Sequence, residues 1–396
     1  MEREQRTLIL VLGCLAAMGP MSIDLYLPAF PLLEQEFATD AAAVSHTMAS
    51  YFIGIAVGQM IYGPVSDSYG RRGPLLVGLV LYLVGSVLCA VSPTIELLSV
   101  ARVVQALGGC AGMVICRAVV RDLFEPAQMA RVFSALLLVM GIAPVLAPSV
   151  GAVIVEWQGW RPLFFMMGAY GFLCLLGTLW KVPPTHPEVG KPLSLTGSFR
   201  TFLELLKHRG FLAYSLSSTF IRIGLFAYIT GSPFLYQNFF GMSPKLFGIV
   251  FGANAAGFVL ASQINSRLVE RYGHQQVYSG VLAATLVGTL PLFVFGWLGK
   301  GPLALTEASI FVFVASLGFS FPCATTGSLE EQPGRAGSAS ALMGLMGSVA
   351  AAATASGVGH LQTLTPMAMP ILVAGSSLAA WLSFQVVFRK STKASS

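Results

Sequence analysis

Long apolar runs, broken by short polar connections, fill almost the whole chain. Charged residues, prolines and loop-forming clusters divide it into twelve runs, at residues 7–33, 44–66, 74–92, 95–117, 130–153, 161–181, 209–235, 244–266, 276–298, 303–328, 336–360 and 366–388. A transmembrane helix needs about 20 mostly apolar residues, and lipid admits only helices and closed barrels as spanning structures. Because the runs are long rather than alternating, they predict an all-α integral membrane protein with twelve transmembrane helices.

The longest connection lies between the sixth and seventh runs. It contains four prolines and several charged residues, and it separates six spans from six. We therefore expect an N-terminal six-helix bundle at residues 1–181, a cytoplasmic central loop at 182–208 and a C-terminal six-helix bundle at 209–396. A weak internal repeat supports two halves, because Tyr69-Gly70 after the second span matches Tyr272-Gly273 after the eighth.

Composition agrees with a membrane location. Hydrophobic residues make up 55% of the 396 residues and charged residues only 10%, whereas a soluble domain carries about 25% charged residues. The net charge of +6 comes from basic residues scattered at the ends of apolar runs, which argues against a nucleic-acid partner. The six cysteines lie in apolar runs without a C-x-x-C pair, so we expect no metal site, and no cofactor is expected.

Basic residues also predict the orientation. If the N-terminus is cytoplasmic, eighteen of the 23 lysines and arginines fall on the cytoplasmic side, three on the other side and two within spans. Positive charge is enriched in cytoplasmic loops of membrane proteins. We expect a multi-pass protein of the bacterial-type inner membrane with both termini in the cytoplasm.

Three charged residues lie deep within predicted spans. Asp24 is the only carboxylate far from a span end, and both Asp24 and Arg102 lie about 10–14 Å below the same end by helical rise. The two side chains could therefore meet, either as a functional pair or as a purely structural one. Arg222 lies near the middle of the seventh span, where it could face Asp24, bind an anionic part of a substrate, or reach along the helix towards water.

Three motifs resemble one transporter family. The loop at residues 63–72 reads Gly-x-x-x-Asp-x-x-Gly-Arg-Arg, the fourth span carries Arg102-Val-Val-Gln105-Ala-Leu-Gly108, and the fifth carries Pro144, Pro148 and Gly151. These resemble the loop, arginine and proline-glycine motifs of the major facilitator superfamily, although Ala152 stands where a second glycine is common. Two short segments resemble the Bcr/CflA drug-resistance branch of that superfamily. They are SIDLYLP at residues 22–28, which begins at Ser22, and RDLF at residues 121–124.

The resemblance implies a drug:proton antiporter that works by alternating access, with substrate bound between the two halves. Asp24 would carry the proton, and Arg102 would tune the affinity of Asp24 for that proton. The implied gating residues are Gly63, Asp67, Gly70, Arg71, Pro144, Pro148 and Gly151. An ordinary solvated turn at Asp67 and plain helix packing in the fifth span are the alternatives.

Further polar and aromatic residues within spans are candidates for substrate binding, although each could instead serve packing. They are Tyr26, Tyr51, Gln59, Gln105, Arg222 and Asn254. The expected partners are a small-molecule substrate, protons and the lipid bilayer, with the protein acting as a monomer. Arg222 keeps open a dedicated exporter or importer of one metabolite. A membrane enzyme lacks support, because no P-loop, HExxH or Gly-x-Ser-x-Gly motif occurs. A non-transporting sensor would need a larger soluble domain.

Overall fold

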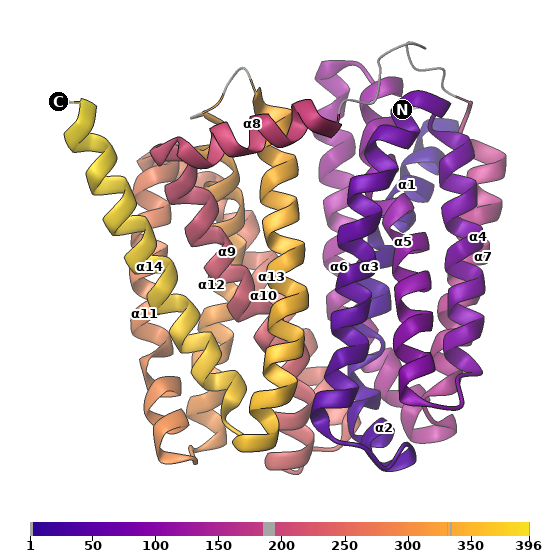
Figure 1. The fold of residues 1–396 in the computed structure, drawn as a ribbon, viewed down its shortest axis with the longest axis vertical. Helices are drawn as coiled ribbons and strands as arrows, with labels where there is room; N and C mark the ends of the chain where they lie inside the picture. Colours follow the sequence, from indigo (N-terminus) through magenta and orange to yellow (C-terminus); the bar gives the residue numbers. More distant parts are fainter. Residues whose placement is uncertain (1–2, 185–194, 331, 333–334, 396) are drawn as a thin grey trace. The chain divides into compact units, whose positions relative to one another are not determined.

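The computed structural model describes residues 3–184, 195–330, 332 and 335–395, and every regular element in this part of the chain is helical (Figure 1). Twelve helical segments are long and apolar enough to cross a membrane. Each coincides with one of the twelve predicted runs, so the predicted all-α, twelve-span fold is confirmed. Residues 185–194, in the predicted central loop, lie outside the described residues.

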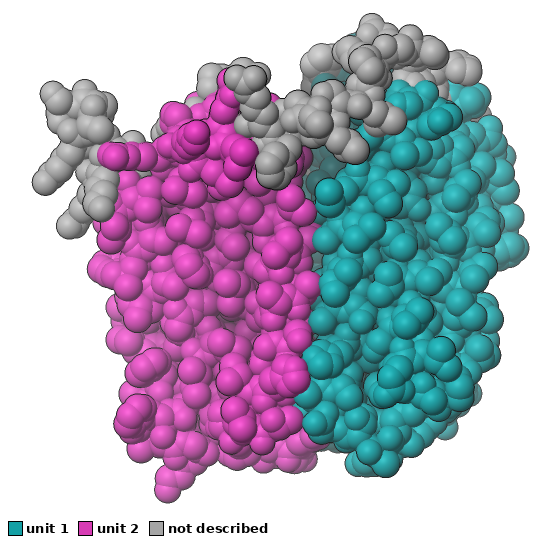
Figure 2. All heavy atoms as spheres, in the orientation of Figure 1, with its two compact units in different colours: residues 1–193, 242–252 teal, residues 194–241, 253–396 magenta. Residues whose placement is uncertain are grey.

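The chain forms two compact units, coloured separately in Figure 2. Unit 1 comprises Met1–Leu193 and Met242–Gly252, and unit 2 comprises Ser194–Gly241 and Ala253–Ser396. The bundle boundaries expected at residues 181 and 209 stay a prediction. The helices of the first unit's main segment are α1 (Arg3–Asp24), η1 (Leu27–Ala29), α2 (Phe30–Glu36), α3 (Ala41–Tyr69), α4 (Arg72–Ala90), α5 (Ile95–Leu123), α6 (Pro126–Gln158) and α7 (Arg161–Lys181).

Helix α5 lies at the centre of unit 1 and packs against α1, α3 and α4. Glycines let the α4 and α5 backbones approach closely, as small residues do at helix interfaces in membranes. A Cβ atom on Gly108 would lie 2.2 Å from the backbone nitrogen of Tyr82, and one on Gly85 would lie 2.4 Å from that of Gln105. This close approach fixes the positions of Arg102 and Gln105 on α5.

The first span, predicted at residues 7–33, is interrupted within its length. Helix α1 ends at Asp24, and the chain continues as η1 and then α2. Two backbone features explain the break. Pro28 has no N–H group to donate to the carbonyl of Asp24, and the Tyr26 N–H bonds to the carbonyl of Ile23, at 3.3 Å, instead of its helical partner Ser22. The break therefore places Asp24 at a helix end inside the span.

The helices assigned to the remaining chain are α8 (Leu195–Lys207), α9 (Arg209–Pro233), η2 (Phe234–Phe239), α10 (Pro244–Tyr272), α11 (His274–Leu298), α12 (Leu303–Glu330), α13 (Ala336–Leu364) and α14 (Ala368–Ser395). In unit 2, α9 packs against α12, α13 and α14. Helix α9 ends at Pro233, after which the six residues of η2 form a π-helix. Such segments are rare and often occur at functional sites.

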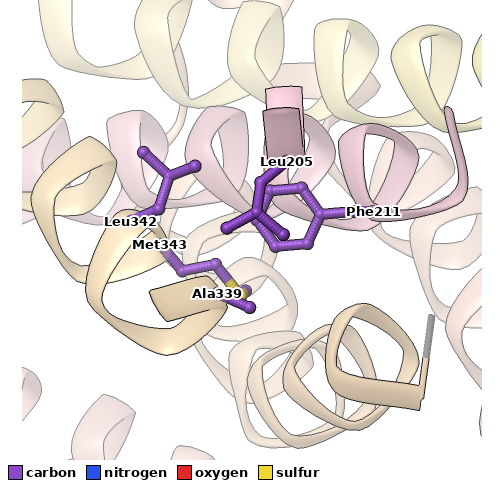
Figure 3. Close-up of a cluster of buried hydrophobic side chains, with 5 residues drawn as sticks. All are labelled: Leu205, Phe211, Ala339, Leu342 and Met343. Carbon is purple, nitrogen blue, oxygen red and sulfur yellow. The ribbon is translucent and has the colours of Figure 1, made fainter. Parts of the chain in front are cut away.

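Helix α8 occupies part of the connection that was predicted to be a polar loop. Its residue Leu205 packs with Phe211 of α9 and with three residues of α13, namely Ala339, Leu342 and Met343 (Figure 3). Arg335, the residue before α13, also donates to Glu204 at 2.7 Å. Helix α8 is too short for a span, and its docking on α9 and α13 buries Leu205.

The internal repeat has a counterpart in the backbone. Gly70 follows α3 with a φ of +86°, and Gly273 follows α10 with a φ of +79°. Positive φ favours glycine because an L side chain would be strained there. In both loops, therefore, a glycine with positive φ follows the tyrosine that ends a long helix.

Candidate functional site

The side chain of Arg102 is fully buried in unit 1 among aromatic rings. Its guanidinium carbon lies 4.1 Å from the ring centre of Tyr51, 4.7 Å from that of Tyr26 and 5.8 Å from that of Phe164. A cation over an aromatic face is attracted by the ring quadrupole, and desolvation strengthens the attraction. The rings thus help to hold a positive charge inside a transmembrane bundle.

Hydrogen bonds complete the surroundings of Arg102. Its Nη1 donates to the backbone oxygen of Ser22 at 3.1 Å and to Oε1 of Gln105 at 2.7 Å. The Gln105 amide in turn donates to Ser86 at 2.9 Å. The carbonyl of Ser22 is the one that lost its helical donor at the α1 break, so Arg102 from α5 supplies a replacement.

Asp24 is only 4% exposed. Among the described residues no ion pair or hydrogen bond involves its side chain, so the expected contact between Asp24 and Arg102 is not formed. The helix geometry explains the difference. Arg102 binds beside Ser22, and positions two residues apart on a helix point about 200° apart. Asp24 is therefore a buried carboxylate without an ionic partner in the described part of the chain.

Helix α6 touches the same break through Gly151. A Cβ atom on Gly151 would lie 2.2 Å from the backbone oxygen of Leu25, the residue after Asp24. No alanine fits at that distance without movement of one backbone. Pro144 and Pro148 lie inside the same helix, two turns and one turn before Gly151 respectively. The proline-glycine motif and the acidic break are thus in direct contact.

Gly151→Ala should push α6 away from the break in α1. We expect a loss of about 1–3 kcal/mol of stability from overpacking and a fall in transport activity. Thermal melting of the purified protein and transport in proteoliposomes measure the two effects. Gly73→Ala is the matched control, because a Cβ atom there meets nothing within 4 Å. Equal behaviour of the two variants would contradict a role for the close contact.

A second cluster follows α3, at the predicted gating loop. The Arg71 side chain pairs with two carboxylates, Asp67 and Asp122, and its Nε lies 2.8 Å from Asp122 Oδ2. It also donates to Ser66 Oγ at 3.0 Å. Burial alone would lower the pKa of Arg71, but the bonds to Asp122 and Asp67 outweigh it and raise that pKa. Arg71 thus joins the end of α3 to the end of α5.

The two carboxylates of this cluster should contribute unequally. The Asp122 side chain is 25% exposed and the Asp67 side chain 63% exposed. We expect Asp122→Asn to cost about 1–3 kcal/mol and Asp67→Asn less than about 1 kcal/mol, because water screens the exposed pair. Thermal melting of both variants tests the order. Arg121→Gln is the control, because it also removes an arginine near Asp122. The Arg121 side chain is exposed, and its Nε lies 3.6 Å from Asp122 Oδ1. A larger loss for Asp67→Asn would refute the order.

The remaining candidates of unit 1 lie in different surroundings. Tyr26 is buried and its hydroxyl lies 2.9 Å from that of Thr47. Gln59 is half-buried, about 12 Å along α3 from Tyr51 by helical rise. Gly63 has open space around it. The structure brings Tyr26, Tyr51 and Gln105 together around Arg102, but it does not bring Gln59 to them.

Two predicted site residues belong to unit 2. The guanidinium carbon of Arg222 lies 4.8 Å from the ring centre of Phe321 on α12. A Cβ atom on Gly347 of α13 would lie 2.9 Å from Arg222 Cδ, so the side chain runs along that helix. Asn254 is fully buried on α10, and its amide donates to the Tyr228 hydroxyl at 3.3 Å.

The comparisons with known proteins agree with this architecture. The family model described as Major Facilitator Superfamily matches residues 12–355. The chain belongs to the major facilitator superfamily. Together with the twelve candidate spans, this makes the chain a multi-pass membrane protein of a transporter family.

Curated bacterial relatives cover most of the chain. An uncharacterized MFS-type transporter of Bacillus subtilis is 36% identical over 87% of this chain and 86% of its own length. A bicyclomycin resistance protein homolog of Haemophilus influenzae is 31% identical over 85% and 84%. Multidrug resistance protein D of Escherichia coli is 28% identical over 97% and 99%. These relatives confirm the predicted resemblance to the Bcr/CflA branch.

Solved structures show the same fold at low sequence identity. The nucleoside transporter NupG has a TM-score of 0.80 at 14% identity and covers 98% of this chain and 100% of its own. A bacterial homolog of the human lysosomal transporter Spinster has a TM-score of 0.74 at 15% identity and covers 98% of this chain and 96% of its own. At such identities the likeness shows the fold alone.

Some residues of these clusters carried no clear signal in the sequence. Ser22 and Tyr82, whose hydroxyl oxygens lie 2.6 Å apart, are common residue types in apolar runs. Tyr236 donates to Glu307, but Glu307 sat near a predicted span end. Asp122 could have been paired with Arg71 from the clustering of charge at the ends of neighbouring spans, since both lie beyond long apolar runs.

Proposed function

We propose that this protein is a proton-coupled secondary transporter that exports small, mostly apolar drugs or toxic compounds. It would exchange them for protons by alternating access, as a monomer in the bacterial-type inner membrane with both termini cytoplasmic. The family and the named relatives support transport, and two of those relatives are named for drug resistance. The proposed division into bundles at 1–181 and 209–396 follows from the span count.

The observation that carries the proton coupling is the state of Asp24. Its carboxylate is buried within a span at a helix break and has no ionic partner among the described residues. An ionisable group in such a place is costly in lipid and marks an ion or substrate pathway. Burial favours the protonated form of a carboxyl group, and water or a neighbouring cation favours the ionised form. A conformational change that alters the surroundings of Asp24 would thus bind or release a proton.

The other clusters have supporting roles in this proposal. Arg102 donates to the Ser22 carbonyl at the break and adds a positive charge there. Tyr26, Tyr51 and Gln105 form its surroundings and are proposed to contact substrate, together with Gln59, Arg222 and Asn254. Arg71 with Asp67, and the motif from Pro144 to Gly151, would serve as gates because they join neighbouring helices at their ends or crossings.

The experiment uses purified protein in proteoliposomes with an imposed pH gradient. Neutral, cationic and acidic antibiotics are offered in turn, and proton and substrate movements are recorded together. Movement of protons opposite to substrate supports export by antiport. Movement in the same direction would overturn it and make the protein an importer. Heat-inactivated protein in the same vesicles gives the background.

A second function has one observation in its favour. Arg222 lies in the middle of α9 within unit 2, against Phe321 and Gly347. A cation at this depth suits an acid-bearing metabolite that the protein exports or imports as its dedicated substrate. Arg222→Gln should then abolish transport of acidic compounds while neutral compounds still move. Equal effects on both groups would exclude recognition of an acid by Arg222.

A further inference from the structure

A second buried cluster lies in unit 2, around Glu307 of α12. The hydroxyl of Tyr236 in η2 donates to Glu307 Oε2, and the amide of Asn254 from α10 interacts with the same carboxylate. Asn254 also donates to the hydroxyl of Tyr228 on α9. Three transmembrane segments thus meet at one carboxylate. The cluster lies at the end of unit 2 away from α8, since α9 runs from α8 to η2.

The carboxyl group of the cluster has no basic partner in the described part of the chain. Among the described residues no lysine, arginine or histidine forms an ion pair with Glu307, although the residue lies inside a span, about 6 Å from the start of α12 by helical rise. Its side chain is half-buried. A carboxylate in this position needs a cation, a proton or strong hydrogen bonds. The hydrogen bonds from Tyr236 and Asn254 satisfy it only in part.

An amide oxygen without a hydrogen-bond partner indicates what kind of cation the cluster would bind. Asn254 is fully buried, and its Oδ1 has no hydrogen-bond partner. A proton on Glu307 would neutralise the carboxylate and would supply a single O–H donor for this amide oxygen. An alkylammonium group has several N–H donors, so it can bond to the carboxylate and the amide oxygen together.

The surroundings suit the apolar part of such a ligand. Tyr236 contributes its ring as well as its hydroxyl, and its ring centre lies 6.5 Å from that of Phe240. Aromatic faces attract cations and also bury hydrocarbon. Tyr236 is carried by the π-helical turn that follows Pro233, and such turns often occur at functional sites.

We propose that Glu307, Asn254 and Tyr236 form a binding site for the ammonium group of small aromatic or alkyl amines. This inference deepens the proposed transporter function by naming a substrate class, and it places recognition in unit 2 rather than at Asp24. Amines would bind Glu307 by a charge-assisted hydrogen bond and Asn254 by a neutral one. Neutral compounds of the same shape would not depend on this site.

The test measures binding of benzylammonium and of benzyl alcohol to the full chain in lipid nanodiscs at neutral pH. In Glu307→Gln the affinity for benzylammonium should fall about 10- to 100-fold, as expected for loss of a charge-assisted bond, while benzyl alcohol binds as in the wild type. Glu307→Asp keeps the charge and should retain part of the affinity. Glu270→Gln is the matched control, since Glu270 is exposed on α10.

Three results would overturn the site. The first is wild-type affinity for benzylammonium in Glu307→Gln. The second is a loss of benzyl alcohol binding as large as that of benzylammonium in both Glu307→Gln and Asn254→Ala. The third is displacement of benzylammonium by sodium but not by potassium ions, which would identify an alkali-cation site. Transport of a neutral drug by Glu307→Gln is measured as well. If the neutral drug is still transported, the proposed function stands even where the amine site fails.

Discussion

Replacement of Asp24 by asparagine should abolish proton movement in exchange for substrate while substrate still crosses the membrane. Asparagine has nearly the same shape as aspartate but cannot take up or release a proton at neutral pH. If Asp24 carries the coupling proton, substrate can then exchange only with substrate. We expect proton flux at the level of empty vesicles and retained counterflow of labelled against unlabelled substrate. Both are measured in proteoliposomes with a pH-sensitive dye and a radiolabelled drug.

Two variants define what this result means. Glu96→Gln removes a carboxylate that is exposed at the start of α5 and should leave coupling unchanged. Asp24→Glu keeps a titratable group, but it lengthens a side chain that is only 4% exposed, so coupling should return only in part. Normal proton exchange in Asp24→Asn would remove Asp24 from the mechanism. Loss of counterflow as well would assign Asp24 to substrate binding instead.

The spans could be predicted from the sequence because lipid leaves little choice. Runs of about 20 apolar residues must form helices there, and the sixth predicted run, 161–181, has the same bounds as α7, Arg161–Lys181. The break inside the first span was not predicted. Pro28 was visible, but prolines are tolerated in many transmembrane helices, and Pro20 lies within α1 without ending it.

The candidate site could be predicted in part. Charges within apolar runs drew attention to Asp24, Arg102 and Arg222, since such charges are rare in membranes. Depth arithmetic placed Asp24 and Arg102 at similar heights but could not give the rotation of α1. A difference of two positions turns a side chain about 200° around the helix. For that reason Ser22, not Asp24, is the residue that Arg102 contacts.

The break in α1 connects several clusters of unit 1. Its free carbonyl at Ser22 accepts from Arg102, its carbonyl at Leu25 lies against Gly151, and its carboxylate at Asp24 lies between these two positions in the sequence. A change in the packing of α5 or α6 would therefore alter the surroundings of Asp24. This arrangement gives a physical route by which helix movement could change the affinity of Asp24 for a proton.

Replacement of Arg102 by methionine should destabilise the protein as well as impair transport. Methionine fills similar space with an apolar chain, but it cannot donate to the Ser22 carbonyl or to Gln105 Oε1. An unsatisfied buried acceptor costs about 1–3 kcal/mol, and inside a bundle water is not available to replace the donor. We expect a melting temperature several degrees below that of the wild type, together with coupled transport near background.

Arg102→Lys separates the hydrogen bond from the charge and the stacking. Lysine keeps a positive charge and can donate to the Ser22 carbonyl, but it lacks the planar group that lies over Tyr51 and Tyr26. We expect its melting temperature to lie between those of Arg102→Met and the wild type. Thermal melting in detergent ranks the three proteins. If Arg102→Met melts at or above the wild-type temperature, the arginine does not stabilise the break. Its role in the buried site would then be to supply a positive charge alone.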